Sequence, residues 1–131
     1  MSTLVVEHSQ LIADFLRCHI KGMTWVARTI SEGLALAVER QPAVIVTSAL
    51  LRGDDRNAVE LIPEYRARSP RAQILVMTAS FEERDARRAL SLGALAYLPK
   101  SDLLAICDWA IRARQLVKTY FHPLPSPSLL H

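Results

Sequence analysis

The chain has 131 residues, half of them hydrophobic and 22% charged, which is the size and composition of a single globular domain. Its 16 Lys and Arg residues are interleaved with 13 Asp and Glu residues, for a net charge of +3, so no basic run indicates a nucleic-acid-binding surface. The N-terminus does not resemble a secretory signal and no apolar stretch approaches the length of a membrane span, so we expect a cytoplasmic protein without a membrane partner. Two cysteines, Cys18 and Cys107, suggest neither a disulfide framework nor a metal site, and we expect both to be buried thiols.

Short apolar runs alternate along the chain with longer amphipathic segments. The runs predict buried strands at residues 4–6, 25–27, 43–46, 74–77 and 94–98. Apolar residues at helical spacing predict helices that include residues 9–21, 56–69 and 102–117, with Pro63 weakening or kinking the second of these. Ser9, Ser31 and Ser101 stand where helix N-caps are expected. The alternation, repeated five times, predicts an α/β fold with an open, mostly parallel five-stranded sheet and helices on both faces.

The amino-acid composition of the chain changes near its C-terminus. Residues 119–131 are rich in proline and cannot continue a helix, so they are expected to form a linker or a frayed end. The sequence therefore predicts one domain over residues 1–118 followed by this tail.

Functional residues of an open parallel sheet gather at the carboxyl ends of its strands. Four segments that fall there resemble parts of a response-regulator receiver domain, in the order LVVEHSQLIADFL, PAVIVTSALLRGDD, ILVMTAS and GALAYLPKSD. Together they cover residues 3–117, and the resemblance implies the flavodoxin-like (βα)5 topology of receivers. The later stretch SDLLAICDWAIRARQLVKTYFHP is similar to the part of NarL/FixJ-type regulators that leads out of the receiver.

The resemblance also implies a role for individual residues. The acidic pair that ends the first strand of a receiver falls on Glu7 and His8. The phospho-acceptor aspartate, counted as six residues after Pro42 and five before Gly53, falls on Ser48. The hydroxyl, the aromatic switch and the lysine of the family fall on Thr78, Tyr97 and Lys100, which keep the family's pattern.

The positions that carry the family's phosphorylation chemistry are the ones that depart from its pattern. That chemistry needs a carboxylate nucleophile and Mg²⁺, which prefers oxygen ligands and carboxylates. Ser48 offers a hydroxyl without charge or low pKa, and His8 is a poor partner for Mg²⁺. We therefore predict no aspartyl phosphorylation, no catalytic residue and no metal or other cofactor, and expect Asp54 and Asp55 to be solvated loop residues.

The residues that keep the pattern allow more than one interpretation. Lys100 has lost its usual anionic partner, so it either turns to solvent or pairs with Glu7 across the altered pocket. Thr78 could hold the turn after its strand, and Tyr97 could be an ordinary half-buried aromatic residue. Either position of Lys100 predicts one resting state, because no phosphoryl group arrives to change the equilibrium.

The last helix carries more apolar residues than one face can bury. A stripe centred on Leu104, Cys107 and Ile111 is expected to face the sheet. Trp109 and Leu116 fall outside that stripe, which is typical of a contact surface.

We predict a protein interface on this outer side, made by Trp109, Leu116, Ile106 and Ala113, and the resemblance implies a homodimer through the helix. The alternative is that Tyr120 and Phe121 fold back and cover it.

Three functions remain open on the sequence alone. The first is a non-enzymatic, phosphorylation-independent receiver-like module that signals by homodimerisation or by docking to another protein. It would stand alone or form the N-terminal part of a LuxR-type transcriptional regulator, with DNA bound only by an output domain outside this chain. The second is a pseudo-receiver whose altered pocket binds a small ligand, with His8, Ser48 and Lys100 at the rim. The third, catalysis by Ser48 with His8 as base, is disfavoured because no nucleophile-elbow glycines flank Ser48.

Overall fold

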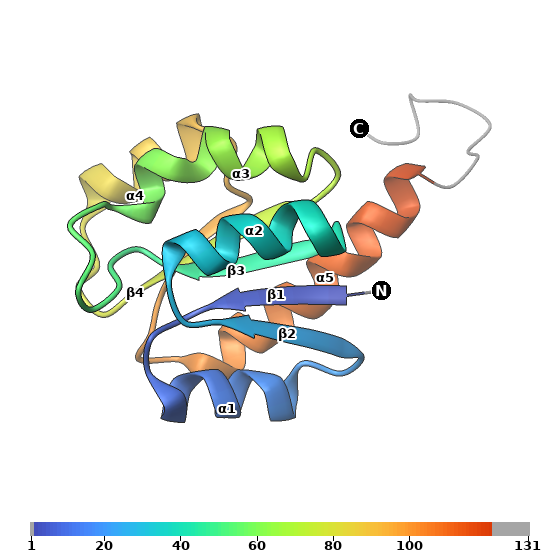
Figure 1. The fold of residues 1–131 in the computed structure, drawn as a ribbon, viewed down its shortest axis with the longest axis horizontal. Coiled ribbons are helices and arrows are strands. Elements are labelled where there is room, and N and C mark those ends of the chain that lie inside the picture. Colours follow the sequence, from blue (N-terminus) through green and yellow to red (C-terminus); the bar gives the residue numbers. More distant parts are fainter. Residues whose placement is uncertain (1, 122–131) are drawn as a thin grey trace.

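The structure is a computed structural model that describes the backbone of residues 2–121 and the side chains of residues 2–116. Five strands form one parallel sheet in the order β2-β1-β3-β4-β5 (Figure 1). The predicted α/β class and the flavodoxin-like topology are thereby confirmed. The strands are β1 (Ser2–Val6), β2 (Met23–Ala27), β3 (Val44–Ser48), β4 (Gln73–Thr78) and β5 (Ala96–Pro99).

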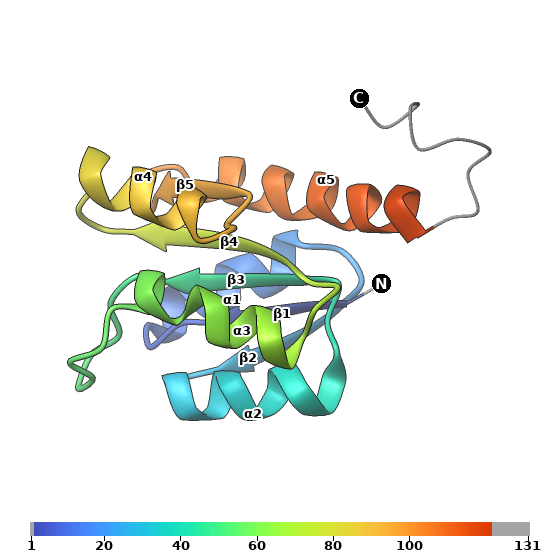
Figure 2. The same cartoon turned by 90° about the horizontal axis from the view of Figure 1, so that it is seen from above.

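Helices cover both faces of the sheet, as Figures 1 and 2 show. Helices α1 and α5 pack on one face, and α2, α3 and α4 pack on the other. Their bounds are α1 (Gln10–His19), α2 (Ile30–Arg40), the short 3-10 helix η1 (Ala58–Leu61), α3 (Ile62–Arg68), α4 (Glu83–Ser91) and α5 (Leu103–Phe121). None of the described helices is long and apolar enough to cross a membrane.

The strands are apolar on both sides because each side faces a layer of helices. In β1, Leu4 and Val6 contribute to the core under α2, α3 and α4, whereas Val5 contributes to the core under α1 and α5. All three are fully buried. The continuous apolar runs of the sequence therefore mark strands that are buried on both faces, as predicted.

Two helix starts differ from the prediction. Ser9 caps α1 as expected and accepts from the backbone N–H of Ile12 at 3.4 Å. Helix α2 is capped by Thr29 instead of Ser31, and the first turn of α5 by Asp102 instead of Ser101. A cap must lie just outside the helix with extended backbone, and Ser31 already lies within α2.

The predicted helix over residues 56–69 is split at Pro63. Residues before it form η1, and α3 begins at Ile62 with the proline in its first turn. A proline is tolerated there because the first N–H groups of a helix have no intrahelical partner.

The face that α5 turns to the sheet was predicted only in part. Among residues 103–116 of this helix, Ile106, Cys107, Ala110 and Ala113 are buried, so Cys107 of the predicted stripe does face the sheet, whereas Leu104 is 62% exposed. Small side chains let the helix approach the sheet closely, so Ala110 and Ala113 mark the contact better than the large apolar residues do.

The predicted interface is therefore half wrong. Ile106 and Ala113 pack in the core beneath α5 and are not available to a partner. Trp109 and Leu116 are exposed, at 38% and 45%, as predicted. Cys107 is buried as expected, but Cys18 is exposed. Helix α5 continues to Phe121, beyond its predicted end at residue 117, and the proline-rich residues 122–131 lie outside the described part of the chain.

Candidate functional site

The residues singled out in the sequence meet at the carboxyl edge of the sheet. Glu7 directly follows β1, Ser48 ends β3, Thr78 ends β4 and Lys100 follows β5. The register pairs the strands in parallel, with Ser48 opposite Met77, so these ends lie side by side. The topology thus brings together positions that are far apart in the sequence.

Glu7 is the centre of this group. Its side chain has no exposed surface, and Lys100 Nζ lies 2.6 Å from its Oε1. Its Oε2 accepts hydrogen bonds from the backbone N–H groups of His8 at 2.7 Å and Ser9 at 3.4 Å. The ion pair is one of the two arrangements expected for Lys100, and it compensates a carboxylate that would otherwise be buried and unpaired.

His8 is held at the mouth of the site by its neighbours. Its Nδ1 lies 3.3 Å from Glu7 Oε2, and its side chain is 34% exposed. The guanidinium of Arg28, which follows β2, donates to the His8 backbone carbonyl, at 3.1 Å from Nε, and to the Gln10 side chain at 2.6 Å. No sequence pattern indicates Arg28, because this contact depends on the pairing of β1 with β2.

Ser48, the residue that the resemblance assigns to the phospho-acceptor position, is fully buried. Its hydroxyl has no hydrogen-bond partner among the described residues, and its carbonyl accepts from the Thr47 hydroxyl at 3.1 Å. No base contacts the hydroxyl, so the arrangement gives Ser48 no activation as a nucleophile.

The two other retained residues are held in place locally. The Thr78 hydroxyl donates to the Ser80 carbonyl and accepts from the Ser80 N–H, both at 3.1 Å, so it holds the turn after β4. Tyr97 is only 7% exposed and packs edge-on against Phe81, with ring centroids 5.2 Å apart. Both findings agree with the local interpretations of these residues, although Tyr97 is more buried than expected.

Asp54 is paired with Arg56 in the loop after β3. The Arg56 guanidinium contacts both of its oxygens, at 3.1 and 2.9 Å, and the Arg56 N–H donates to it at 3.0 Å. These hydrogen bonds lower the pKa of the Asp54 carboxyl below its ordinary value of 3.8. Asp54 is thus engaged within its own loop.

The donors at the sheet edge do not fit the Mg²⁺ ion that the receiver fold implies. Mg²⁺ requires near-octahedral oxygen coordination and usually one or two carboxylates. Glu7 is the carboxylate at this point, and both of its oxygens already have partners. Among residues 2–116, no three His, Cys, Asp or Glu side chains lie together so that they could hold a metal ion.

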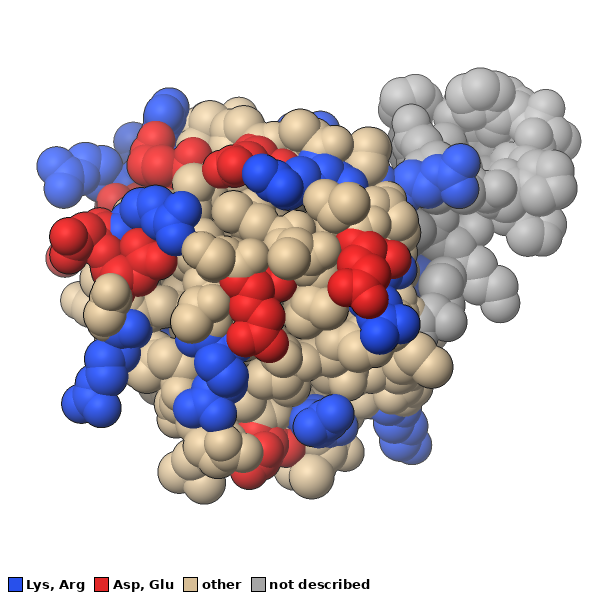
Figure 3. Space-filling model, viewed as in Figure 1, with Lys and Arg blue, Asp and Glu red and all other residues tan. Residues whose placement is uncertain are grey.

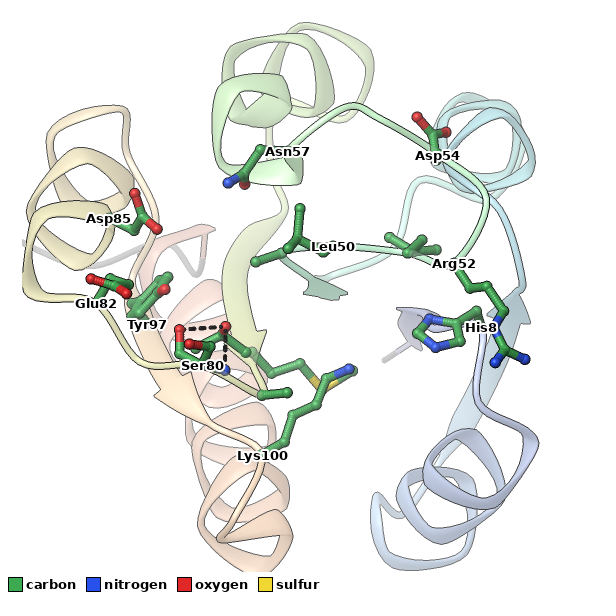
Figure 4. Close-up of a pocket in the computed structure, with 15 residues that line it drawn as sticks. His8, Leu50, Arg52, Asp54, Asn57, Ser80, Glu82, Asp85, Tyr97 and Lys100 are labelled. Atoms are coloured by element: carbon green, nitrogen blue, oxygen red, sulfur yellow. Dashed lines mark hydrogen bonds between the residues drawn. The ribbon is translucent and has the colours of Figure 1, made fainter.

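A cavity of about 650 Å³ opens beside this cluster (Figure 4). It lies between the loop that follows β3 and the start of α4. His8 and Lys100 line it as the ligand hypothesis expected, whereas the buried Ser48 does not. Sequence reasoning missed other polar residues of its wall, which lie in loops or at the start of α4: Arg52, Asn57, Glu82 and Asp85.

Comparisons with known proteins agree with this fold. No protein-family model matches the sequence. The chain is similar to the KDP operon transcriptional regulatory protein KdpE of Escherichia coli, with 34% identity over 76% of this chain and 44% of that protein. It is also similar to the transcriptional regulatory protein CutR of Streptomyces coelicolor, with 31% identity over 95% of this chain and 57% of that protein. The chain thus spans about half the length of these curated relatives.

A solved structure shows the same architecture. The beryllofluoride-activated NtrC4 receiver domain dimer matches with a TM-score of 0.73 and 22% identity, over 86% of this chain and 98% of that one. A likeness at this identity establishes the fold, and the relatives add similarity of sequence. The chain therefore has the fold of a receiver domain, and its sequence is similar to about half of each of two transcriptional regulatory proteins.

Proposed function

We propose that this receiver domain is a signalling module that works without phosphorylation, through homodimerisation or docking to another protein. The observation that carries the proposal is the 2.6 Å ion pair between Glu7 and Lys100. It engages the retained lysine with the remaining carboxylate of the acidic pair, at a site where Ser48 stands in the phospho-acceptor position. Such a module is not an enzyme.

The same contacts favour a single resting state. Lys100 is paired with Glu7, Thr78 is bound to Ser80, and Tyr97 is buried against Phe81. A ligand shifts a conformational equilibrium only by its different affinity for the two states. Without a phosphoryl group, the output of this domain would depend on its concentration and on its partners.

Helix α5 provides the surface that we propose for dimerisation. The Arg114 guanidinium donates to the Lys21 carbonyl in the loop after α1, which marks the side of α5 that faces α1. At about 100° per residue, Trp109 and Leu116 lie roughly 140° and 160° around the helix from Arg114. They are therefore on the flank turned away from α1, where two large exposed apolar side chains favour a partner.

The relatives suggest where the output is used. KdpE and CutR are named as transcriptional regulatory proteins, and this chain matches about half of each. We propose that the chain serves transcriptional regulation, either alone or as the N-terminal receiver of a NarL/FixJ-like, LuxR-type regulator. In the second case DNA would be bound by an output domain outside this sequence.

The dimer can be tested by mass measurement with a matched pair of variants. Light scattering of the purified chain should give a dimer, and Trp109→Glu should give a folded monomer. Leu104→Glu is the control, because Leu104 is exposed on the other flank of the same helix, and it should remain a dimer. Acetyl phosphate with Mg²⁺ should leave the mass distribution unchanged. A dimer that survives Trp109→Glu would exclude this flank as the interface.

A further inference from the structure

The cavity beside Lys100 has an acidic wall at the start of α4. Glu82 caps this helix and Asp85 lies in its first turn. Among the described residues, neither carboxylate has a side-chain hydrogen bond or an ion pair, whereas the adjacent Glu83 pairs with Arg87 at 2.6 Å. The helix N-terminus favours both negative charges but leaves them without a cation.

The facing wall is basic. Figure 4 shows Arg52 and His8 across the cavity from Glu82 and Asp85. The Arg52 guanidinium has no ion-pair partner among the described residues. Lys100 reaches the same wall and is 12% exposed, and its ammonium has three N–H donors, of which the contact with Glu7 needs one.

The space between the walls is lined by apolar side chains. Leu50 is 60% exposed and Met77 is fully buried, and both contribute to the lining. Tyr97 adds its ring, and its buried hydroxyl has no hydrogen-bond partner among the described residues. An exposed leucine and an unpartnered tyrosine hydroxyl next to one cavity are features that a bound molecule would cover.

We infer that this cavity binds a small linear zwitterion, with an ammonium group at one end, a carboxylate at the other and a methylene chain between them. The ammonium pairs with Glu82 and Asp85, and the carboxylate with Arg52 and the free donors of Lys100. The methylene chain lies over Leu50. A ligand with one charge would leave one wall unpaired, so both charges contribute to the affinity. This gives the domain an input that does not depend on a phosphoryl group.

A short series of probes tests the ligand class. β-Alanine, γ-aminobutyrate and ε-aminocaproate carry the two charges at increasing separation, and caproate and hexylamine each lack one of them. Calorimetric titration of the full chain should show saturable binding of at least one zwitterion. The analogue with a single charge should bind roughly tenfold more weakly or worse. Absence of saturation by all three zwitterions up to about 10 mM, or equal binding of caproate or hexylamine, would overturn the inference.

Variants of each wall assign the two ends. The Glu82→Gln, Asp85→Asn double variant should reduce the affinity for the zwitterion to that for caproate, and Arg52→Gln should reduce it to that for hexylamine. Glu83→Gln is the matched control, because Glu83 lies outside the cavity on the same helix, and it should bind like the parent. Circular dichroism melting establishes that each variant is folded, and Glu82→Gln alone replaces the double variant if that one is not. Loss of binding in Glu83→Gln, or full affinity in both wall variants, would contradict the assignment.

Light scattering of the same samples separates this inference from the proposed dimer. The cavity lies at the carboxyl edge of the sheet, whereas Trp109 lies on α5 and does not line the cavity. The wall variants should therefore keep the parent's mass whether or not they bind the probes.

Discussion

Lys100 Nζ lies 2.6 Å from Oε1 of Glu7, a carboxylate without any exposed surface. The pair joins the end of β1 to the loop after β5, across the carboxyl edge of the sheet. A buried carboxylate is costly unless it is paired and hydrogen-bonded, and Glu7 also accepts from the backbone N–H of His8. The pair is therefore central both to the stability of this edge and to the proposed resting state.

Removing one member of the pair should destabilise the domain more than removing both. Lys100→Met leaves Glu7 buried without its cation and should lower the free energy of unfolding by about 3–5 kcal/mol. Adding Glu7→Gln to that variant should recover part of the loss, because the uncompensated charge is then absent. Urea denaturation of the parent, the two single variants and the double variant gives the coupling energy. A coupling below about 0.5 kcal/mol would mean that the two groups do not depend on each other.

Gly33 packs where a side chain has no room. A Cβ at this position would lie 2.8 Å from both Tyr65 Oη and Val6 Cγ2, which are buried core atoms. Gly33→Ala should therefore destabilise the domain by about 1–3 kcal/mol, although alanine is the better helix former. Tyr65→Phe removes one of the two clashing atoms and should reduce that loss in the double variant. Thermal melting of the four proteins checks this, and a stabilising Gly33→Ala would show that α2 can move away from β1.

Tyr65 should make the domain sensitive to alkaline conditions. Burial raises the pKa of its hydroxyl from 10.0 to about 12. The unfolded chain thus releases this proton at lower pH than the folded chain. The contribution is fully present below about pH 10 and is lost as the pH rises toward 12. Melting temperatures measured between about pH 8 and about pH 11 should fall less steeply in Tyr65→Phe than in the parent, and parallel curves would contradict this.

Arg88 and Glu60 form a bridge between α4 and η1. The guanidinium contacts both carboxylate oxygens, with its closest contact at 2.8 Å, and it lowers the pKa of Glu60 below its ordinary value of 4.5. The contribution of the bridge is present above that value and is lost as the pH falls through the lowered pKa. Arg88→Gln should increase amide hydrogen exchange in α4 at neutral pH, with Arg87→Gln as an exposed control on the same helix. Equal protection of α4 in both variants would show that the bridge does not hold this helix.

The sheet could be predicted well from the sequence because strands that are buried on both faces appear as continuous apolar runs. Runs such as Leu4–Val6 are apolar without interruption, and their ends identify the carboxyl edge where Glu7 and Ser48 meet. The resemblance then located Thr78, Tyr97 and Lys100 at the same edge. At these positions the local sequence pattern and the topology of the sheet point to the same place in the fold, so few other placements are consistent with the sequence.

Other features depend on contacts that the sequence pattern does not encode. The buried face of α5 was predicted only in part, because Ala110 and Ala113 determine the approach to the sheet, whereas the prediction centred the face on Leu104 as well as Cys107. Arg28 reaches His8 only because β2 pairs with β1. The charged walls of the cavity come from separate loops and from the start of α4, and no periodicity of the sequence indicates that Arg52 and Glu82 share a site.

Intact mass spectrometry decides whether this domain takes up a phosphoryl group. The chain is incubated with acetyl phosphate and Mg²⁺ and weighed, with the His8→Asp, Ser48→Asp double variant as the matched control that regains an acceptor and an acidic pair. We expect an unchanged mass for the parent and a gain of about 80 Da for the double variant. A gain of about 80 Da on the parent chain would show that the domain is phosphorylated and that the proposed function is wrong.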